Sequence, residues 1–298
     1  MSRWSRAADA AVAALVRAGF ALLRALGPEL APRLGGWVAR NLGPLLPLQR
    51  GTLDNIRHAF PELPAAEHHR IAWEAWDNLG RTACEYVHME AIWDFDPAHP
   101  NTGRIEAPPE MIERFEALRL DGKPALIFGA HLANWELPAI AAARHGLDAA
   151  VLYRTPNNPT VARDILALRA GSMGVLIPAG IAAPIRMMEA LDEGKHVGML
   201  IDQRFGRGPR VPFLGRLAAS NPLLARLARR FDCPVHGART IRLPGGRFRM
   251  ELTEAIHLPR DATGRVDVDA ATAMLNRIVE GWVREHPGQW LWMHRRWR

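Results

Sequence analysis

His131 and Glu136 are the residues whose types and spacing best suit proton transfer. They stand in the segment IFGAHLANWE, where a histidine follows an apolar run and a glutamate follows five residues later. Ligands of open α/β sheets bind beyond the carboxyl ends of the strands, so this position suits catalysis. If His131 lies in a turn and Glu136 opens the next helix, the carboxylate can reach back to the imidazole and stabilise its protonated form. The pair also fits a histidine that caps a helix and a glutamate placed for the helix dipole.

Two later blocks place polar residues directly after apolar runs. AVLYRTPNNP, at 150–159, puts Arg154 where it could hold a phosphate or the oxyanion of a tetrahedral intermediate. MLIDQRFGRGPRVPFLGR, at 199–216, ends a run on Asp202 and Gln203 and continues with four arginines separated by glycines. The glycines predict a loop that folds closely over an anion, although a solvated loop also fits.

The elements that must position these residues read as an α/β protein. Short apolar runs alternate with helical patterns, which predicts βαβ units and a mostly parallel central sheet flanked by helices. We expect strands at ALIFG, AAVLYR, GVLIP and VGMLID, and an antiparallel pair that turns at Pro244 to Gly246. Helices are expected over 135–146, around IRMMEALDEG, over 221–231 and in VDAATAMLNRIVEGWVREHP.

The first hundred residues have a different texture. Residues 1–100 are rich in Ala, Leu, Trp and Arg, and we expect an N-terminal helical layer that associates with a membrane. A proline-containing join, DFDPAHPNTG, separates this layer from the core at 101–298. Both parts are expected to form one structural domain.

The segment from Ala7 to Leu26 is the strongest membrane signal. No stretch of 18 uncharged apolar residues occurs, so an ordinary spanning helix is not predicted. In a helix Arg6, Arg17 and Arg24 point in nearly one direction, which is typical of an interfacial helix whose arginines reach lipid phosphates. A helix packed on its own domain and a short tilted insertion stay open.

Charge and cysteine usage narrow the function classes. The chain has 38 Lys plus Arg against 31 Asp plus Glu, and arginine supplies most of the excess, which suits phosphate or carboxylate recognition. Neither Cys84 nor Cys233 belongs to a ligand cluster, so we expect no metal site and no disulfide framework. A basic nucleic-acid binder would share the charge, but no nucleic-acid module is recognised.

Five blocks together resemble a known family. HLANWE, YRTPNNP, GMLIDQR with VPFLG, the tail PGQWLWMHRRW, and NIRHAFPEL at 55–63 resemble the late acyltransferases of lipid A biosynthesis, the lauroyl and myristoyl transferases of the lysophospholipid acyltransferase superfamily. The resemblance runs from about residue 8 to the C-terminus and implies a glycerolipid acyltransferase-like fold. Two features depart from the family pattern: Arg17 and Arg24 interrupt the N-terminal anchor, and Glu136 stands where many superfamily members have Asp.

The resemblance also implies an activity. Such an enzyme moves a fatty acyl group from acyl carrier protein to a hydroxyl of a phosphorylated glycolipid, a lipid A precursor, at the cytoplasmic face of the inner membrane. It needs no cofactor besides the acyl donor and binds no nucleic acid. His131 would be the catalytic base and Glu136 its acidic partner. The residues implied in substrate binding are Arg154, Asn157, Asn158, Asp202, Gln203 and Arg204.

Several alternatives stay open on the sequence alone. The same chemistry could serve another membrane lipid, such as a phospholipid, an aminolipid or a glycolipid, and water in place of the hydroxyl would make a hydrolase. We expect direct transfer without a covalent enzyme intermediate, because there is no GxSxG elbow and neither cysteine lies in these blocks. The tail QWLWMHRRWR fits either an interfacial segment or one docked on the core.

Overall fold

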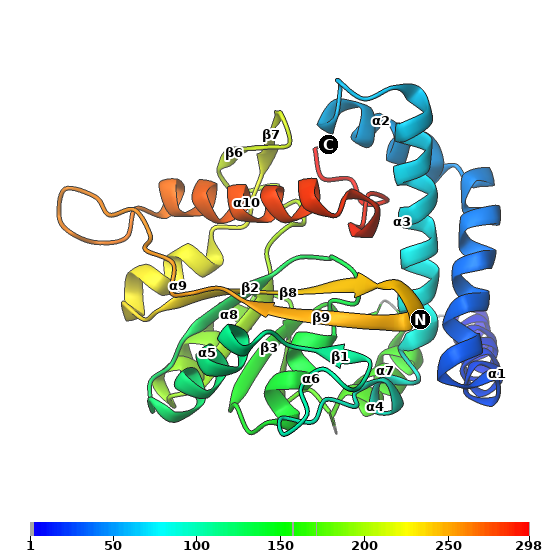
Figure 1. Cartoon of the computed structure of the whole chain (residues 1–298), viewed down its shortest axis with the longest axis horizontal. Coiled ribbons are helices and arrows are strands. Elements are labelled where there is room, and N and C mark those ends of the chain that lie inside the picture. Colours follow the sequence, from blue (N-terminus) through cyan, green and yellow to red (C-terminus); the bar gives the residue numbers. More distant parts are fainter. Residues whose placement is uncertain (1–2, 157, 171, 298) are drawn as a thin grey trace.

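A seven-stranded sheet forms the centre of the computed structural model (Figure 1), which describes residues 3–156, 158–170 and 172–297. Its strand order is β1-β9-β8-β2-β5-β3-β4, and every neighbouring pair is parallel except β8 and β9. The predicted α/β class with a mostly parallel sheet is therefore confirmed. The strands of this sheet are β1 (Ile105–Glu106), β2 (Leu126–Gly129), β3 (Ala149–Tyr153), β4 (Val175–Pro178), β5 (His196–Leu200), β8 (Val235–Leu243) and β9 (Arg247–Leu252).

Helices cover both faces of the sheet (Figure 1). One apolar cluster joins α8, α9 and α10 to the side chains of β2, β5 and β8, while two smaller clusters join α5 and α6 to the opposite face. Burial on both faces explains why the central strands read as short continuous apolar runs. The helices of the core are α5 (Pro109–Leu120), α6 (Leu137–Arg144), α7 (Pro159–Ala170), α8 (Ala183–Asp192), α9 (Leu223–Phe231) and α10 (Val268–Glu285).

The N-terminal layer is helical, as predicted. It consists of α1 (Arg3–Leu42), η1 (Gly43–Leu45), α2 (Leu48–Ala59), α3 (Ala65–Glu85) and α4 (Met89–Ile92). Helix α1 is kinked at Gly27, whose φ of 76° and ψ of 170° break the helical path just before Pro28. Proline suits the first turn of the helix that follows, so sequence and kink agree.

The part of α1 after the kink packs tightly on α3. A Cβ added at Gly80 would lie 2.2 Å from the backbone oxygen of Gly35, and one added at Gly35 would lie 2.6 Å from that of Gly80. Only glycine lets the two backbones approach this closely, so these positions fix where α1 and α3 cross.

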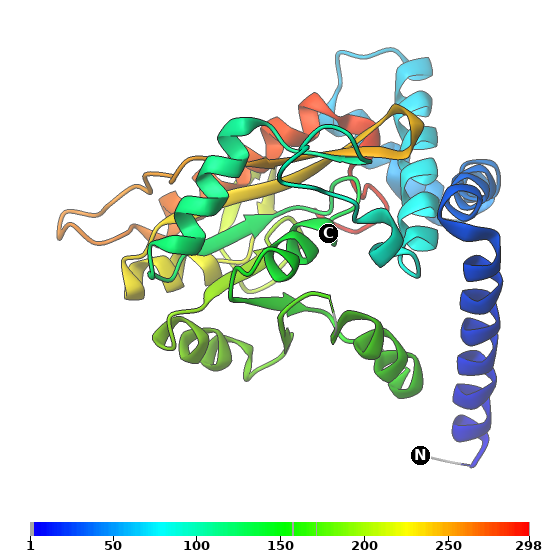
Figure 2. The ribbon, with the colours of Figure 1, turned by 60° about the horizontal axis from the view of Figure 1, so that its bottom comes forward.

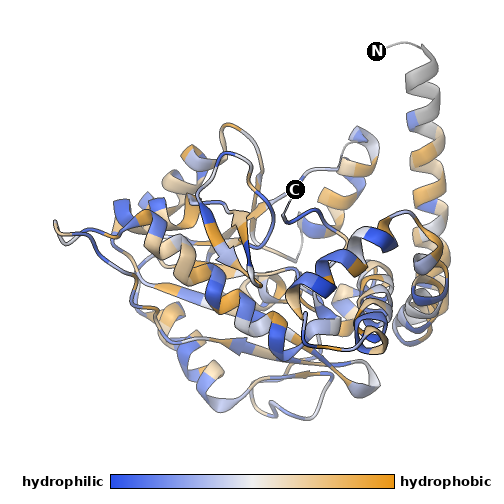
Figure 3. Cartoon of the chain, turned by 90° about the horizontal axis from the view of Figure 1, so that it is seen from above, coloured by the Kyte–Doolittle hydropathy of each residue, from blue (hydrophilic) through white to orange (hydrophobic). Residues whose placement is uncertain are grey.

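The part of α1 before the kink extends away from the sheet (Figure 2) and carries apolar residues along much of its length (Figure 3). By length and composition, Ala11–Leu45 is long and apolar enough to cross a membrane, whereas the sequence pattern predicted an interfacial helix. Leu15 and Leu22 are exposed, while Arg17 donates to Asp164 on α7 at 2.8 Å instead of projecting freely. The side chain of Arg6 lies outside the described residues.

The first part of the arginine-rich segment, residues 203–209, is a loop as predicted, but residues 210–219 form a hairpin. Strands β6 (Arg210–Phe213) and β7 (Arg216–Ala219) pair antiparallel, with Phe213 opposite Arg216. The two turn residues, Leu214 and Gly215, both have positive φ, which matches the twist of a tight hairpin. Val211 and Phe213 are buried, while Arg210 and Pro212 are exposed. The alternation in RVPF is therefore the pattern of a half-buried strand.

The C-terminal tail is docked on the core. Trp290 and Trp292 are 1% and 0% exposed, and their rings meet edge to face at 4.7 Å between centroids. Trp292 also contacts Phe60 of the N-terminal layer. Of the two alternatives for the tail, the structure therefore shows the docked segment, because its tryptophans supply core volume and are not free to meet lipid.

Candidate active site

His131 lies in the turn between β2 and α6, where two side chains lie within hydrogen-bond distance of its ring nitrogens. Its Nδ1 lies 2.8 Å from Oδ1 of Asp202, and its Nε2 lies 3.1 Å from Nε2 of Gln203. The carboxylate requires a proton on Nδ1, so Nε2 is the basic nitrogen and accepts a hydrogen bond from the Gln203 amide. The tilted ring of Trp135 covers the imidazole at 5.1 Å between centroids.

Asp202 is fully buried and acts only through its hydrogen bonds. Its Oδ2 accepts from the backbone N–H of His131 at 2.8 Å and from the indole of Trp290 at 2.8 Å. Burial by itself raises the pKa of Asp202, but the charge and hydrogen bonds of His131 outweigh it and hold that pKa well below its ordinary value. The residue is therefore an ionised carboxylate that orients the imidazole.

The expected contact between Glu136 and His131 is wrong: the carboxylate on the imidazole belongs to Asp202. Glu136 is the N-cap residue of α6, and its carboxylate forms an ion pair with Arg169 of α7. A short turn separates residues 131 and 136, and the buried Asp202, two residues beyond the neighbouring strand β5, already occupies the Nδ1 side of the ring. Glu136 lines the same cavity, and among the described residues its carboxylate is hydrogen-bonded to Arg169 and not to the histidine.

Arg169 is a site residue that the sequence did not single out. Its guanidinium lies between the rings of Tyr86 and Tyr153, at 5.4 and 5.5 Å from their centroids, while Glu136 holds one end. Burial, followed by the Glu136 carboxylate, raises the pKa of Tyr86 well above its usual range, so this phenol stays neutral. The cluster thus places the Arg169 guanidinium in the cavity wall, with its charge balanced by the Glu136 carboxylate.

A second polar cluster fixes the backbone of the turn that carries His131. Ala133 has a positive φ of 49°, and its carbonyl accepts hydrogen bonds from Asn78 and Thr82 of α3. Asn134 is fully buried and donates to Glu85, which in turn pairs with Arg242. A strained, non-glycine turn persists because these contacts over-determine it, and such strain is typical of functional sites.

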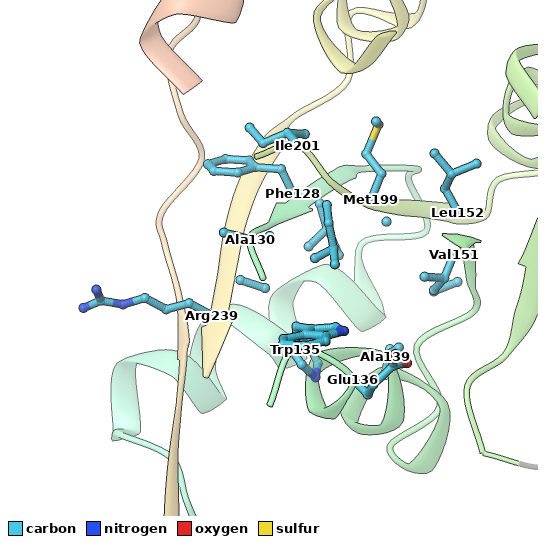
Figure 4. Close-up of a pocket in the computed structure, with 18 of the residues that line it drawn as sticks. Phe128, Ala130, Trp135, Glu136, Ala139, Val151, Leu152, Met199, Ile201 and Arg239 are labelled. Atoms are coloured by element: carbon cyan, nitrogen blue, oxygen red, sulfur yellow. The ribbon is translucent and has the colours of Figure 1, made fainter. Parts of the chain in front are cut away.

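An apolar cavity of about 440 Å³ adjoins the histidine. It lies between Trp135 of the histidine turn and Ala139 of α6 on one side and the strands that carry Val151 and Met199 on the other (Figure 4). Apolar residues of α5, α6 and β9 also line it. The segment LPAIAAA of α6 contributes to the lining, whereas no described residue before Met111 does.

The remaining predicted residues divide into two groups. Arg154 and Arg204 line the cavity with His131, Glu136 and Gln203, and both arginines are exposed at its rim. Asn158 is used otherwise: its side-chain oxygen accepts from the backbone of Thr160 at the start of α7, and its amide donates to Asp9 of α1. Asn157 lies outside the described residues.

The arrangement combines an oriented base with an apolar chamber. A carboxylate-held imidazole can take a proton from a hydroxyl group at Nε2, and guanidinium groups at the rim can bind an anion. The apolar cavity suits a hydrocarbon chain, whose burial is favourable in proportion to its area. These are the requirements for acyl transfer from an activated fatty acid to a lipid hydroxyl.

Comparison with known proteins agrees with this geometry. The model of a family described as bacterial lipid A biosynthesis acyltransferase matches residues 2–298. No curated protein matches the chain. The match covers essentially the whole sequence, including the histidine turn, the cavity and the tail.

Proposed function

The chain belongs to the bacterial lipid A biosynthesis acyltransferase family, and we propose that it transfers a fatty acyl group from acyl carrier protein to a hydroxyl of a lipid A precursor. The reaction takes place at the cytoplasmic face of the inner membrane, with His131 as the general base. The observation that carries the proposal is the Asp202–His131 pair at the wall of an apolar cavity.

In the proposed mechanism, Nε2 of His131 removes the proton from the acceptor hydroxyl. The resulting alkoxide oxygen forms a bond to the thioester carbonyl carbon, and the carbon–sulfur bond then breaks. The leaving thiolate takes the proton back from the imidazolium, so the base is regenerated. Asp202 keeps Nδ1 protonated throughout and stabilises the imidazolium, as the acid of a catalytic triad does. The Gln203 amide gives up its bond to Nε2 when the hydroxyl binds.

The acyl chain occupies the apolar cavity in this proposal. The cavity is walled by Leu and Met side chains and by the small residues of α6, and His131 stands at one side. A thioester whose chain enters the cavity thus presents its carbonyl carbon near the base. Glu136 and Arg169 shape this wall as a compensated pair and take no part in proton transfer.

The acceptor is held by its phosphate. Arg154 and Arg204 are exposed at the rim, and no carboxylate lies within salt-bridge distance of either guanidinium among the residues that the structure describes. Free guanidinium groups bind phosphate in a bidentate manner, which suits a phosphorylated glycolipid. The excess of arginine over acidic residues also suits an acidic carrier protein, and the apolar face of α1 suits a membrane.

The proposal is tested by measuring acyl transfer from acyl carrier protein thioesters of several chain lengths to a tetra-acylated lipid A precursor. The intact protein is compared with His131→Ala and with His257→Ala, which removes an exposed histidine that does not line the cavity. We expect loss of transfer by about 10²- to 10⁴-fold in the first variant and none in the second.

Each other result has a definite meaning. Transfer that survives His131→Ala would sink the proposed mechanism. An intact protein that acylates a different membrane lipid but not the lipid A precursor would show that the acceptor is wrong. Release of free fatty acid without any acylated lipid would assign the site to hydrolysis.

A further inference from the structure

Trp290 makes a direct hydrogen bond to the carboxylate that holds the histidine. Its indole N–H donates to Oδ2 of Asp202 at 2.8 Å, while Oδ1 of the same carboxylate faces the His131 ring at 2.8 Å. The two oxygens therefore have separate duties. One is bonded to the imidazole, and the other is fixed by the indole and by the backbone N–H of His131.

The backbone on either side of Trp290 is also hydrogen-bonded to the histidine turn. The N–H of Leu291 donates to the carbonyl of His131 at 3.1 Å, and the N–H of Ala133 donates to the carbonyl of Gln289 at 2.9 Å. Leu132 and Trp290 form an isolated antiparallel bridge between these bonds. The same short segment thus contacts both partners of the pair, the backbone of the base and the side chain of the acid.

The segment is itself held rigidly. The Trp290 ring packs against Phe213 at 5.6 Å and Trp292 at 4.7 Å between centroids. Farther along, Arg296 is fully buried and donates to Ser220 and Asn276. An indole so enclosed has no other orientation available, so its N–H is a fixed donor to the carboxylate.

We propose that Trp290 is a positioning residue for the acyl transfer: its indole N–H holds Asp202 in the orientation that directs Nε2 of His131 toward the cavity. The inference rests on the proposed function. The Trp290 side chain does not line the cavity, so its indole N–H acts through Asp202. Its loss reduces kcat and leaves KM unchanged, because ground-state binding does not involve it.

The pH profile gives a second readout. The titratable and charged groups that face Asp202 are His131 on the turn, and His294 and Arg296 on the tail. Removing the indole donor leaves a carboxylate with more negative charge on the imidazole side. The imidazolium is then favoured up to a higher pH, and the acid limb of the kcat profile moves upward. A purely structural role for the ring would not move this limb.

The chain offers a matched control. Trp292 is equally buried and also donates one indole hydrogen bond, but to the carbonyl of Pro287 within the tail. Trp290→Phe and Trp292→Phe thus remove the same N–H from neighbouring tryptophans, and only the first reaches Asp202. In Trp290→His, the imidazole Nε2 occupies the ring position of the indole nitrogen, so the donor returns while the large ring is lost.

The experiment measures kcat, KM, the pH profile and Tm for the full chain and these three variants. We expect kcat to fall about 10- to 100-fold in Trp290→Phe, as for loss of a hydrogen bond to a charged group. It should stay within about twofold in Trp292→Phe and recover partly in Trp290→His. We expect the Tm of Trp290→His to be lower than that of Trp290→Phe, because the large ring is lost. Losses of kcat that follow Tm across the three variants would overturn the proposal.

A substrate-free measurement separates this inference from the proposed function. The Nδ1–H proton of His131 is followed by NMR and assigned by its absence from His131→Gln. If the intact protein transfers no acyl group, the proposed function fails, and the NMR signal alone then tests whether Trp290 positions the Asp202–His131 pair. A shift in Trp290→Phe but not in Trp292→Phe supports the indole contact as a determinant of the pair, and an unchanged signal overturns it.

Discussion

His131 and Asp202 each lie two residues beyond a pair of residues that face each other across parallel strands, Gly129 of β2 and Leu200 of β5. The register of two strands therefore brings the base and its carboxylate together at the same edge of the sheet. The carboxylate is fully buried and the histidine is partly exposed, so one group orients while the other faces the cavity. This relationship leads to the first predictions.

Asp202→Asn should leave the fold intact and remove most of the activity. An amide in place of the carboxylate can donate to the imidazole, which favours the tautomer with the proton on Nε2 and leaves no base for the hydroxyl. We expect kcat for acyl transfer to fall by about 10²- to 10⁴-fold. The measurement is steady-state transfer with circular dichroism as the folding control. Near-normal kcat would mean that the carboxylate does not set the tautomer.

The same residue predicts how stability depends on pH. The pKa of Asp202 in the folded protein lies below its value of about 3.9 in an unfolded chain. A carboxyl group with a depressed folded pKa contributes stability above the unfolded value and loses it as the pH falls through the folded value. The difference in unfolding free energy between the intact protein and Asp202→Asn should therefore narrow below about pH 4. Urea unfolding at pH 6 and pH 3 measures it, and an equal difference at both would contradict the prediction.

The Glu136–Arg169 pair should matter for stability more than for proton transfer. Glu136→Gln leaves the guanidinium uncompensated between two tyrosine rings, at a position where both side chains of the pair are largely buried. We expect a loss of about 3–5 kcal/mol in unfolding free energy, with strong coupling in a double-mutant cycle with Arg169→Gln. A Glu136→Gln variant as stable as the intact protein but as inactive as His131→Ala would restore Glu136 as the partner of the base.

Arg204 should govern the binding of the phosphorylated acceptor. Arg204→Gln removes a rim guanidinium, so KM for the acceptor should rise about tenfold with little change in kcat, and the effect should weaken at high salt. Arg216→Gln is the matched control, because Arg216 is an exposed arginine of the β7 strand that does not line the cavity. Equal KM values for the two variants would remove Arg204 from the acceptor site.

The glycine crossing of α1 and α3 predicts a stability effect remote from the chemistry. Gly80→Ala forces a Cβ against the backbone oxygen of Gly35, and we expect a loss of about 1–3 kcal/mol. In Gly51→Ala, also within a helix, the new Cβ meets nothing within 4 Å, so that variant should be neutral or slightly more stable. Thermal unfolding of both compares them, and similar Tm values would show that the crossing relaxes easily.

The sequence predicted the elements of the core better than the contacts of the site. The apolar runs of β2, β3 and β5 are recognisable in the sequence because central parallel strands are covered on both faces. The edge strand β4 is recognisable as a short apolar run between two helical patterns. The partner of His131 is not, because a reading along the chain favours the nearby Glu136, whereas the contact with Asp202 depends on β2 and β5 being neighbours in the sheet. Strand order is a property of the whole fold, and no local pattern specifies it.

Other site residues escaped for related reasons. Arg169 lies on α7, whose sequence gives no sign of a site, and only the tertiary structure brings it to Glu136 at the start of α6. Trp290 belongs to a tail whose tryptophans and arginines have the composition of a membrane interface, but tertiary packing buries them. Asn157 and the division of the chain into two parts remain predictions from the sequence.

The distances along the chain between the groups of the site have a consequence for how the protein folds while it is being translated. Asp202 follows His131 by 71 positions, and Trp290 follows Asp202 by another 88. During translation, the strands that carry the histidine and the aspartate leave the ribosome well before the tail. The nascent chain can thus pair its central strands early, but the aspartate lacks its indole donor until Trp290 emerges. Contacts between residues so distant in sequence slow folding. Until they form, His131 lies beside the acyl-binding cavity without the indole contact that orients its carboxylate partner.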